Sequence, residues 1–557
     1  MGGSSLDILR NVHASVFFRD NKNLLLPTFI ALVCFLIYFP VLGYEFVRWD
    51  DYELILGNPL VQFFSPKIFW SFDPELYVPL TLLTYQIEYA LVGAEPFLFH
   101  ATNLILHAAN AVLIFFLLRK VLQDPLLAAG GALLFAVHPL HAETVSWISA
   151  RKELLMTLLS IGSLLAALNA DEKERAFSPL GLILFLCALL SKVTAISVPL
   201  VLALLLWHRR RAPRKIIKTI APYLGLSVLF GIIALVGRSD PLMLLTPLQT
   251  LLLAFRSAAF SLQQFFLPLR FSAIYPAPTD LSVMNPIILL SAAVVMGLMV
   301  AAFLFRRRMP LVSIGFAIFI ISLAPSFLAY AKSNDVTMSA DRYAYLPLIG
   351  LVLLVTSLLY ELLRKRSTLA LVILIALSAP LSFKAFAQSH TWQTTETLFL
   401  NVLQSYPNSH VALNNLGQSA LVQNQTDSAM EYFRKALTQK PNYPDALVNL
   451  GAAYGRKNML LEAEQMLQKA LNLDPDHPNG VYNLAGVYMV RGQTAEAIRL
   501  YKRAIDLAPF FTPAHWHLAR TLHKAGNHQE ARIVYQRLLE MDSSYRGRSA
   551  ELDGLLQ

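Results

Sequence analysis

Charged residues are scarce in this chain of 557 residues. Asp, Glu, Lys and Arg make up 15% of it, whereas hydrophobic residues make up 55%. Soluble domains carry about 25% charged residues. The composition therefore excludes an ordinary soluble enzyme and an intrinsically disordered chain. It indicates instead a membrane protein with many spans and a soluble part attached.

Cysteine and the common catalytic motifs are also missing. The two cysteines, Cys34 and Cys187, lie within apolar runs, which excludes a disulfide framework or a CxxC site. The sequence has no glycine-rich phosphate loop and no G-x-S-x-G nucleophile motif, so a cytoplasmic nucleotide substrate is not indicated. Basic residues form short clusters without interleaved aromatics, and we expect no binding of nucleic acid.

Eleven apolar runs predict membrane-spanning helices. A helix needs about 20 apolar residues to cross the hydrocarbon core, and several of the runs are shorter than that. The predicted spans are about 24–42, 97–118, 126–138, 154–169, 179–190, 195–207, 219–236, 287–305, 311–330, 347–362 and 368–386. Region 245–270 is apolar but broken by Arg256, Gln263 and Gln264. We expect it to be an interfacial helix on the outer surface.

The basic clusters predict the orientation. Arg209–Arg211, Arg306–Arg308 and Arg364–Arg366 all fall between spans on the side that also holds the N-terminus. Cytoplasmic connections are enriched in Lys and Arg, so the N-terminus is predicted to be cytoplasmic and the C-terminal region to lie outside. The first run has no cleavage site after it and is predicted to be a retained helix. Two long outer segments follow, about 43–96 and 237–286.

The C-terminal part repeats with a period of 34 residues. The repeat is seen in four sets of residues: Pro407, Pro441, Pro475 and Pro509; Ala429, Ala463, Ala497 and Ala531; Phe433, Leu467, Tyr501 and Tyr535; and Asn424, Asn458, Gly492 and Gly526, which mark the turn between two helices. This is the tetratricopeptide repeat (TPR) pattern. We predict an all-α chain with a multi-spanning domain, 1–390, and an α-solenoid of about four repeats, 391–557. Such a solenoid has a concave face for extended peptide; stacking or dimerisation of the repeats is the alternative.

Acidic residues follow the first span closely. Asp50 and Asp51 would lie at the outer membrane face, where one carboxylate can act as a general base while its neighbour tunes it. A solvated loop or a helix cap is an equally good interpretation of two adjacent Asp residues.

A second outer turn is rich in ionisable residues. His138, His141 and Glu143 lie within six residues and are compatible with a metal site or with a polar network. Arg151 and Lys152 follow and can bind phosphate, although basic residues at span ends often only reach toward water.

Two further cations are predicted on the outer side, where positive charge is disfavoured. Lys192 lies between two short apolar runs, and Arg342 lies in the sequence Asp341-Arg342-Tyr343. The acids and these cations thus converge on one face. An anionic lipid headgroup entering sideways would meet Arg151, Lys152, Lys192 and Arg342, and an acceptor entering from water would meet Asp50 and Asp51.

Six stretches of the sequence together resemble the TMTC-like protein O-mannosyltransferases, members of the GT-C fold of polyprenyl-phosphate-sugar-dependent glycosyltransferases. They are Phe46-Val-Arg-Trp-Asp-Asp51, Phe99-His-Ala-Thr-Asn-Leu-Ile-Leu-His107, His138-Pro-Leu-His-Ala-Glu143, Trp147-Ile-Ser-Ala-Arg-Lys-Glu153, Ser191-Lys-Val-Thr-Ala195 and Ala340-Asp-Arg-Tyr-Ala-Tyr-Leu-Pro347. The order of a membrane domain followed by TPR repeats is also similar.

The resemblance implies an active site at the outer face, with the catalytic carboxylate in the first outer loop. That role would fall on Asp50, with Asp51 as its partner. The implied donor is a lipid-linked sugar phosphate, held by Arg151, Lys152, Lys192 and Arg342. His138, His141, Glu143 and Tyr343 would shape the site. The resemblance implies no fixed metal ligand; a divalent metal remains open.

The favoured hypothesis is a glycosyltransferase that modifies Ser or Thr of secreted or envelope proteins, with the concave TPR face binding the acceptor protein. A lipid or glycan acceptor and a non-enzymatic, membrane-anchored TPR scaffold are the alternatives. A transporter would place ionisable residues at mid-membrane, whereas these lie at span ends. We expect a bacterial inner membrane location with the repeats in the periplasm; the endoplasmic reticulum is equivalent by topology.

Overall fold

The computed structural model describes residues 24–72, 77–175, 177–237, 245–329, 331–332 and 335–556. Parts of the two predicted outer segments, 73–76 and 238–244, therefore lie outside the described residues. The chain forms two compact units, Met1–Leu398 and Phe399–Gln557. Each unit is built from helices, and the first also contains three short strands.

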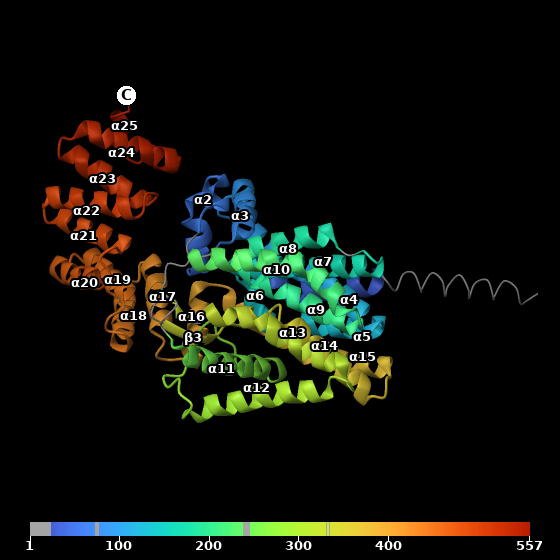
Figure 1. Ribbon diagram of the computed structural model, residues 1–557. Coiled ribbons are helices and arrows are strands. Elements are labelled where there is room, and N and C mark those ends of the chain that lie inside the picture. Colours follow the sequence, from blue (N-terminus) through green and yellow to red (C-terminus); the bar gives the residue numbers. More distant parts are fainter. Residues whose placement is uncertain are drawn as a thin grey trace, which may run out of the picture. The chain divides into compact units, whose positions relative to one another are not determined.

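Helices of the first unit run side by side as a bundle (Figure 1). Its first described helix begins at Leu24, and with the following 3-10 turn forms the span Leu24–Gly43. The other helices are α2 (Pro59–Gln62), α3 (Pro79–Val92), α4 (Pro96–Leu122), α5 (Pro125–Ala136), α6 (Ala142–Ser146), α7 (Arg151–Glu172), α8 (Pro179–Ser191), α9 (Val198–His208), α10 (Pro213–Val236), α11 (Pro247–Phe266), α12 (Pro286–Phe305), α13 (Pro310–Leu323), α14 (Leu348–Leu362) and α15 (Ser367–Ser389).

Each of the eleven predicted spans coincides with one of these helical segments. Seven helices are long and apolar enough to cross a membrane by length and composition. The pair Pro125–Ala136 and Pro139–Ser146 passes the same test together, with a bend of 50° between its halves. The shorter apolar helices Pro179–Ser191, Val193–His208 and Leu348–Leu362 match the remaining predicted spans. The chain is thus a helical membrane protein, as predicted.

Local sequence explains where many of these helices begin. Proline occupies the first turn of α5, α8 and α12, where its missing N–H costs nothing and its fixed φ favours the helix. A polar side chain caps each of them: Asp124, Ser178 and Asn285 accept hydrogen bonds from the exposed N–H groups of the first turn. Such caps stabilise a helix by about 1 kcal/mol.

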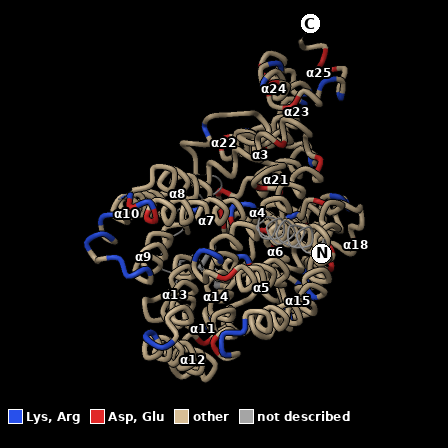
Figure 2. The backbone as a smooth tube through the Cα atoms, turned by 90° about the vertical axis from the view of Figure 1, so that its right-hand side faces the viewer, with Lys and Arg blue, Asp and Glu red and all other residues tan. Residues whose placement is uncertain are grey.

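Helix α11 covers most of region 245–270. It is not among the helices of the described chain that meet the criterion for a span. It runs along α12 in both views (Figures 1 and 2). The interfacial position predicted for this region remains a prediction, but the helix is packed into the bundle rather than isolated on its surface.

Basic connections gather at one end of the bundle. Figure 2 looks onto that end, where Lys and Arg colour the connection between α9 and α10. This connection holds Arg209, Arg210 and Arg211. The buried carboxylate of Asp171 binds two of the neighbouring cations, at 3.0 Å from Arg211 Nε and 2.8 Å from Lys215 Nζ.

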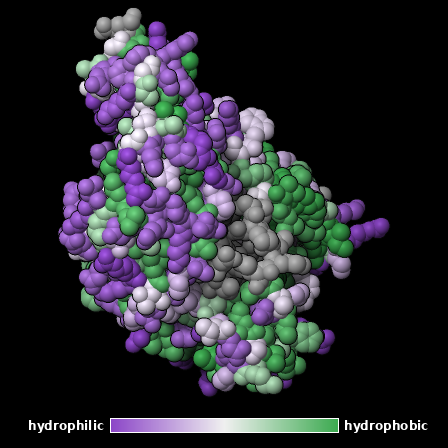
Figure 3. Space-filling view, turned by 90° about the vertical axis from the view of Figure 1, so that its left-hand side faces the viewer, coloured by the Kyte–Doolittle hydropathy of each residue, from purple (hydrophilic) through white to green (hydrophobic). Residues whose placement is uncertain are grey.

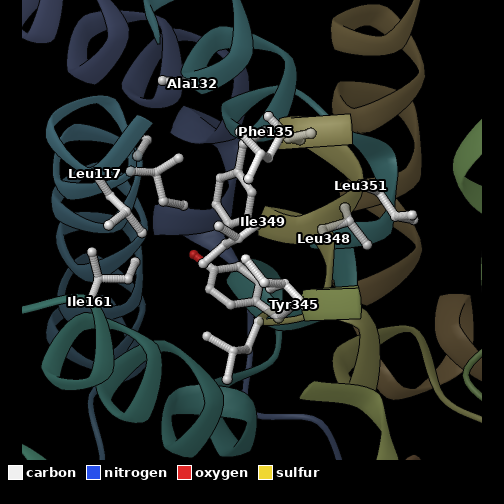
Figure 4. Packing of buried hydrophobic residues seen from close by; sticks show 14 of the residues in the cluster. Leu117, Ala132, Phe135, Ile161, Tyr345, Leu348, Ile349 and Leu351 are labelled. Carbon is white, nitrogen blue, oxygen red and sulfur yellow. The ribbon is translucent and has the colours of Figure 1, made fainter. Parts of the chain in front are cut away.

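The core of the bundle combines aliphatic and aromatic side chains. Leu117, Phe135, Ile161 and Leu348 pack around Tyr345 from different helices (Figure 4). Helices α13 and α14 approach especially closely, because a Cβ on Gly315 would lie 2.6 Å from the carbonyl oxygen of Gly350. Only glycine permits that approach.

A small sheet leads into the segment that carries Arg342. Strand β3 (Asp335–Ser339) pairs antiparallel with β1 (Tyr275–Pro276) and with β2 (Ala331–Lys332). The chain then enters a 3-10 turn, Asp341–Ala344. The sheet therefore fixes the start of the turn that carries Arg342.

The second unit is a stack of helix pairs. They are α17 (His410–Val422) with α18 (Thr426–Gln439), α19 (Pro444–Arg456) with α20 (Leu460–Leu473), α21 (Pro478–Val490) with α22 (Thr494–Leu507), and α23 (Thr512–Lys524) with α24 (His528–Met541); α25 (Ala550–Gly554) follows. Helix α16 (Thr395–Ser405) precedes them across the boundary between the units. The face of the repeats that Figure 3 shows is mostly hydrophilic.

The repeat residues pack and turn as the 34-residue pattern predicts. A Cβ on Gly417 would lie 2.4 Å from the Phe433 ring, so the small residue admits the large one. The turn residues Asn424, Asn458 and Gly492 have φ of 61°, 59° and 77°, a left-handed conformation that Gly and Asn tolerate best. The predicted solenoid is therefore confirmed at the level of individual residues.

Candidate functional site

Asp51 fastens the first outer loop to the start of α7. Its side chain is fully buried. Oδ2 accepts a hydrogen bond from the N–H of Val47 at 3.0 Å, and Oδ1 accepts from the N–H of Ser149 at 2.9 Å and from the Ser149 hydroxyl. Both carboxylate oxygens therefore face groups of the protein rather than an incoming molecule. These contacts give Asp51 a positioning role in the loop, and a share in catalysis remains a prediction.

Asp50 has a different environment from its neighbour. Its side chain is 34% exposed, and its Oδ2 lies 3.9 Å from Lys152 Nζ. Lys152 itself is nearly buried and lies 6.0 Å from the centre of the Trp147 ring. The structure therefore separates the two adjacent acids: Asp51 holds the loop and Asp50 is accessible beside a cation.

Arg342 and Lys192 meet at a pair of buried glutamates. Arg342 Nη1 lies 2.5 Å from Glu143 Oε1. Glu153 Oε1 lies 2.5 Å from Lys192 Nζ and 3.9 Å from Arg342 Nε. Both cations also lie near the Tyr343 ring, at 5.2 Å for Lys192 and 5.0 Å for Arg342. Lys192, Arg342, Glu143 and Tyr343, predicted from three different sequence segments, are thus brought together.

The charge of Arg342 links this cluster to Asp50. Burial alone would lower the pKa of its guanidinium. The carboxylates of Glu143, Glu153 and Asp50, with Glu143 the strongest of the three, outweigh burial and raise the pKa of Arg342 above its ordinary value. Asp50, Lys152, Lys192 and Arg342 therefore belong to one electrostatic cluster.

A polar cavity opens beside these cations. It has an empty volume of about 310 Å³, and its lining includes Glu153, Lys192, Thr194, Ser322, Arg342 and Tyr343. Oxygen Oε2 of Glu153 is buried and has no hydrogen-bond partner within the described structure. Buried polar groups normally have partners, so this oxygen marks a place where a polar ligand can be held.

An apolar cavity adjoins the polar one. Ser322 and Leu346 line both. Its other walls come from α4, α7, α9, α13 and α14. Cationic and apolar spaces thus lie next to each other inside the bundle.

Arg151 is not part of this cluster. It is fully buried, and its Nη1 lies 2.5 Å from Glu88 Oε2. It also donates hydrogen bonds to Asn103 Oδ1 at 2.9 Å, to Thr84 Oγ1 at 3.2 Å and to the carbonyl of Phe99 at 2.8 Å. The donors of Arg151 are thus engaged by α3 and α4, which favours a structural ion pair. Binding of the donor phosphate by Arg151 remains a prediction.

The two histidines of the second segment lie in the core rather than at the cations. His138 Nε2 is 3.1 Å from the carbonyl of Phe265, and its ring stacks on the Phe265 ring at 4.9 Å. His141 packs against Phe135 and Tyr345 at 4.3 and 4.6 Å. Glu143 instead forms an ion pair with Arg342. Among the described residues, no three His, Cys, Asp or Glu lie close enough to hold a metal ion.

Sequence reasoning missed four residues of the site. Glu153 and Ser149 lie within the stretch Trp147–Glu153, in which only Arg151 and Lys152 were predicted to bind a ligand. Asp341 and Tyr275 form a further buried pair, with the Tyr275 hydroxyl 3.0 Å from both Asp341 oxygens. Burial and the neighbouring Glu143 raise the pKa of Asp341 well above its ordinary value. This pairing joins two segments that are distant in sequence, so it could not be predicted from either of them.

Asp51 should make stability depend on pH. Burial raises the pKa of its carboxyl from 3.8 to about 7. Between these two pH values the folded state holds a proton that the unfolded state has lost. The contribution of Asp51 to the free energy of unfolding is therefore greatest below pH 3.8, and it falls by up to roughly 1.4 kcal/mol per pH unit as the pH rises to 7. We expect the thermal midpoint of wild-type protein to fall between pH 5 and 7 relative to that of Asp51→Asn, and the difference to level off above pH 7. Parallel curves for the two proteins would contradict this assignment.

Comparisons with known proteins identify the repeats and a group of similar proteins. Residues 420–480 and 482–546 each match a family model described as tetratricopeptide repeat. Over 187 residues the chain is 34% identical to protein O-mannosyl-transferase F38B6.6 of Caenorhabditis elegans; the match covers 31% of this chain and 26% of that protein. Over 179 residues it is 35% identical to human protein O-mannosyl-transferase TMTC1, covering 28% and 20%.

The matches span about a quarter or less of the length of these relatives. They confirm the predicted similarity to TMTC-like proteins. Among solved structures, the chain is similar to TTC0263, a TPR protein of Thermus thermophilus, at 23% identity and a TM-score of 0.27, covering 33% of this chain and 95% of that one.

Proposed function

We propose that this TMTC-like chain is an integral membrane glycosyltransferase of GT-C type that transfers a sugar from a polyprenyl-phosphate donor to Ser or Thr hydroxyls of secreted or envelope proteins. The observation that carries the proposal is the accessible carboxylate of Asp50 beside Lys152, in one electrostatic cluster with Lys192 and Arg342. The relatives that match the chain are named protein O-mannosyl-transferases. The sugar transferred here need not be mannose.

The donor phosphate would bind at the polar cavity. Lys192 and Arg342 line it, and each is paired with a glutamate that holds it in place without filling its capacity for hydrogen bonds. Lys152 lies between this cavity and Asp50 in the same cluster. Cations fixed in this way stabilise the negative charge that develops on a leaving phosphate.

The first isoprene units would enter the adjoining apolar cavity. Its shared walls, Ser322 and Leu346, connect it to the cations. An amphipathic lipid phosphate needs these two environments next to each other, because its charged head must stay hydrogen-bonded while its tail avoids polar groups. A free sugar phosphate has no apolar tail that could be buried in this cavity.

The reaction would be a single displacement. Asp50 accepts the proton of the acceptor hydroxyl, whose oxygen forms a bond to the anomeric carbon of the sugar. The bond from that carbon to the phosphate oxygen breaks, and polyprenyl phosphate leaves with the electron pair. Because phosphate is a good leaving group, no strong general acid is needed, and the anomeric configuration inverts. A general base of this kind contributes about 10²–10⁴-fold to the rate.

The repeats would bind the acceptor protein and keep its hydroxyls near the membrane surface, which raises their effective concentration. We place the site and the repeats on the outer side, in the periplasm of a bacterial inner membrane. The basic connections at the other end of the bundle support this orientation.

The proposal is tested by the masses of secreted and envelope proteins. Cells that produce the chain should yield Ser/Thr peptides with hexose-sized mass increments, and cells that lack it should not. Incubation of the purified protein with a polyprenyl-phosphate hexose and such a peptide should reproduce the increment. Unchanged protein masses together with a new glycolipid or surface glycan would establish the alternative acceptor. Unchanged masses and unchanged lipids would favour a scaffold and refute the enzyme.

A further inference from the structure

The loop that carries Asp50 is hydrogen-bonded to residues 393–395, which lie close to the C-terminal end of the first unit. The N–H of Arg48 donates a hydrogen bond to Thr395 Oγ1 at 2.8 Å, across 347 positions of sequence. The N–H of Glu45 donates to the carbonyl of Gln393 at 3.1 Å. Two backbone N–H groups of the loop thus depend on residues 393–395 for their hydrogen bonds.

Three tryptophans reinforce this attachment. The rings of Trp49 and Trp147 stack with centroids 5.2 Å apart and planes 19° apart, and those of Trp147 and Trp392 stack at 5.4 Å and 24°. Trp147 and Trp392 are almost entirely buried. Trp49 directly precedes Asp50. The stack therefore runs from the segment at 392, through the start of the cation-bearing turn, to the residue next to the acid.

The direction of the Asp50 carboxylate depends on this backbone. Its contact with Lys152 is long, 3.9 Å, which is too far for a hydrogen bond to fix the side chain. Its neighbours on both sides are held firmly: Arg48 by Thr395, and Asp51 by Ser149 and Val47. A misplacement of about 1 Å can cost a reaction about 10²-fold, so the attachment of this loop matters for a general base.

We propose that Trp392 and Thr395 are positioning residues that hold Asp50 in line with Lys152 and Arg342. This inference rests on the role proposed above for Asp50. Neither residue lines the polar cavity. Thr395 acts on the loop through its hydrogen bond to Arg48, and Trp392 acts through the ring of Trp147. The chain after α15 therefore contributes to the site before the repeats begin.

Thr395→Val tests the hydrogen bond without changing the shape of the side chain. We expect kcat to fall about tenfold while the KM for a polyprenyl-phosphate hexose stays within twofold, because the loop moves and the cation cavity does not. Thr395→Ser keeps the hydroxyl and should restore kcat. Thr391→Val is the matched control, since the Thr391 hydroxyl bonds only within its own turn, to Gln388, and it should behave as wild type.

A second measurement does not depend on activity. Hydrogen–deuterium exchange of a peptide covering residues 44–52 should be about tenfold faster in Thr395→Val and in Trp392→Leu, and near wild type in Thr395→Ser and Trp392→Phe. Unchanged exchange and unchanged kcat in Thr395→Val would overturn the inference. If the wild-type protein transfers no sugar, the proposed function fails, while the exchange experiment still decides whether this segment holds the loop.

Discussion

Replacing Asp50 with Asn should lower kcat by about 10²–10⁴-fold. The amide has the shape of the carboxylate but cannot accept the hydroxyl proton, and a general base contributes about 10²–10⁴-fold. The change should leave folding intact, because Asp50 is partly exposed and its contact with Lys152 is 3.9 Å long. The measurement is the initial rate of sugar transfer by purified protein in lipid vesicles, with thermal unfolding as the test of folding.

Asp51 provides the matched comparison for this experiment. The two acids are adjacent, yet Asp51 is buried and accepts hydrogen bonds from Val47 and Ser149. We expect Asp51→Asn to lower the thermal midpoint and to reduce kcat less than Asp50→Asn does. If Asp50→Asn retained wild-type kcat while Asp51→Asn lost all activity in a folded protein, the roles assigned to the two acids would be reversed.

Replacing Arg151 with Met should destabilise the first unit by about 3–5 kcal/mol. The change leaves the carboxylate of Glu88 buried without its cation, and breaking a buried ion pair on one side costs this much. The double variant Glu88→Gln, Arg151→Met removes both charges and should recover much of the loss. Unfolding in a mixed-micelle titration with a denaturing detergent measures the difference.

Lys120→Met is the control for this prediction. Lys120 and Glu172 form an ion pair of similar length, 2.6 Å, but Glu172 is 46% exposed. An exposed pair contributes at most about 1 kcal/mol, so this variant should be near wild type. The donor KM of the Glu88→Gln, Arg151→Met double variant should also be unchanged. A strongly raised donor KM with normal stability would instead show that Arg151 binds the donor phosphate.

The architecture follows from local sequence. Apolar runs predict the spans because the hydrophobicity of a helix depends on its own residues. The repeats are predicted by the 34-residue period, since a small residue and a large one must recur where two helices touch. Gly417 against Phe433 and the left-handed turn at Asn424 bear this out. The sequence also identifies the connections between spans in which the candidate residues lie.

The roles of individual charges could not be predicted in this way. Arg151 and Lys152 are neighbours, yet α7 turns the first toward Glu88 and the second toward Asp50. Adjacent residues on a helix point in directions about 100° apart, so the partner of each depends on which helix packs on that side. The same holds for Glu143, which lies close to two histidines in sequence but pairs with Arg342.

The sequence by itself thus determined the class of the protein, its spans, its repeats and the face on which its ionisable residues gather. The tertiary structure alone decided which acid is accessible, which cations share a cavity, and that Thr395 and Trp392 support a loop near residue 50. Helix formation and repeat spacing are encoded by neighbouring residues. Ion pairs and buried hydrogen bonds join segments hundreds of residues apart, and their geometry is fixed only when those segments pack.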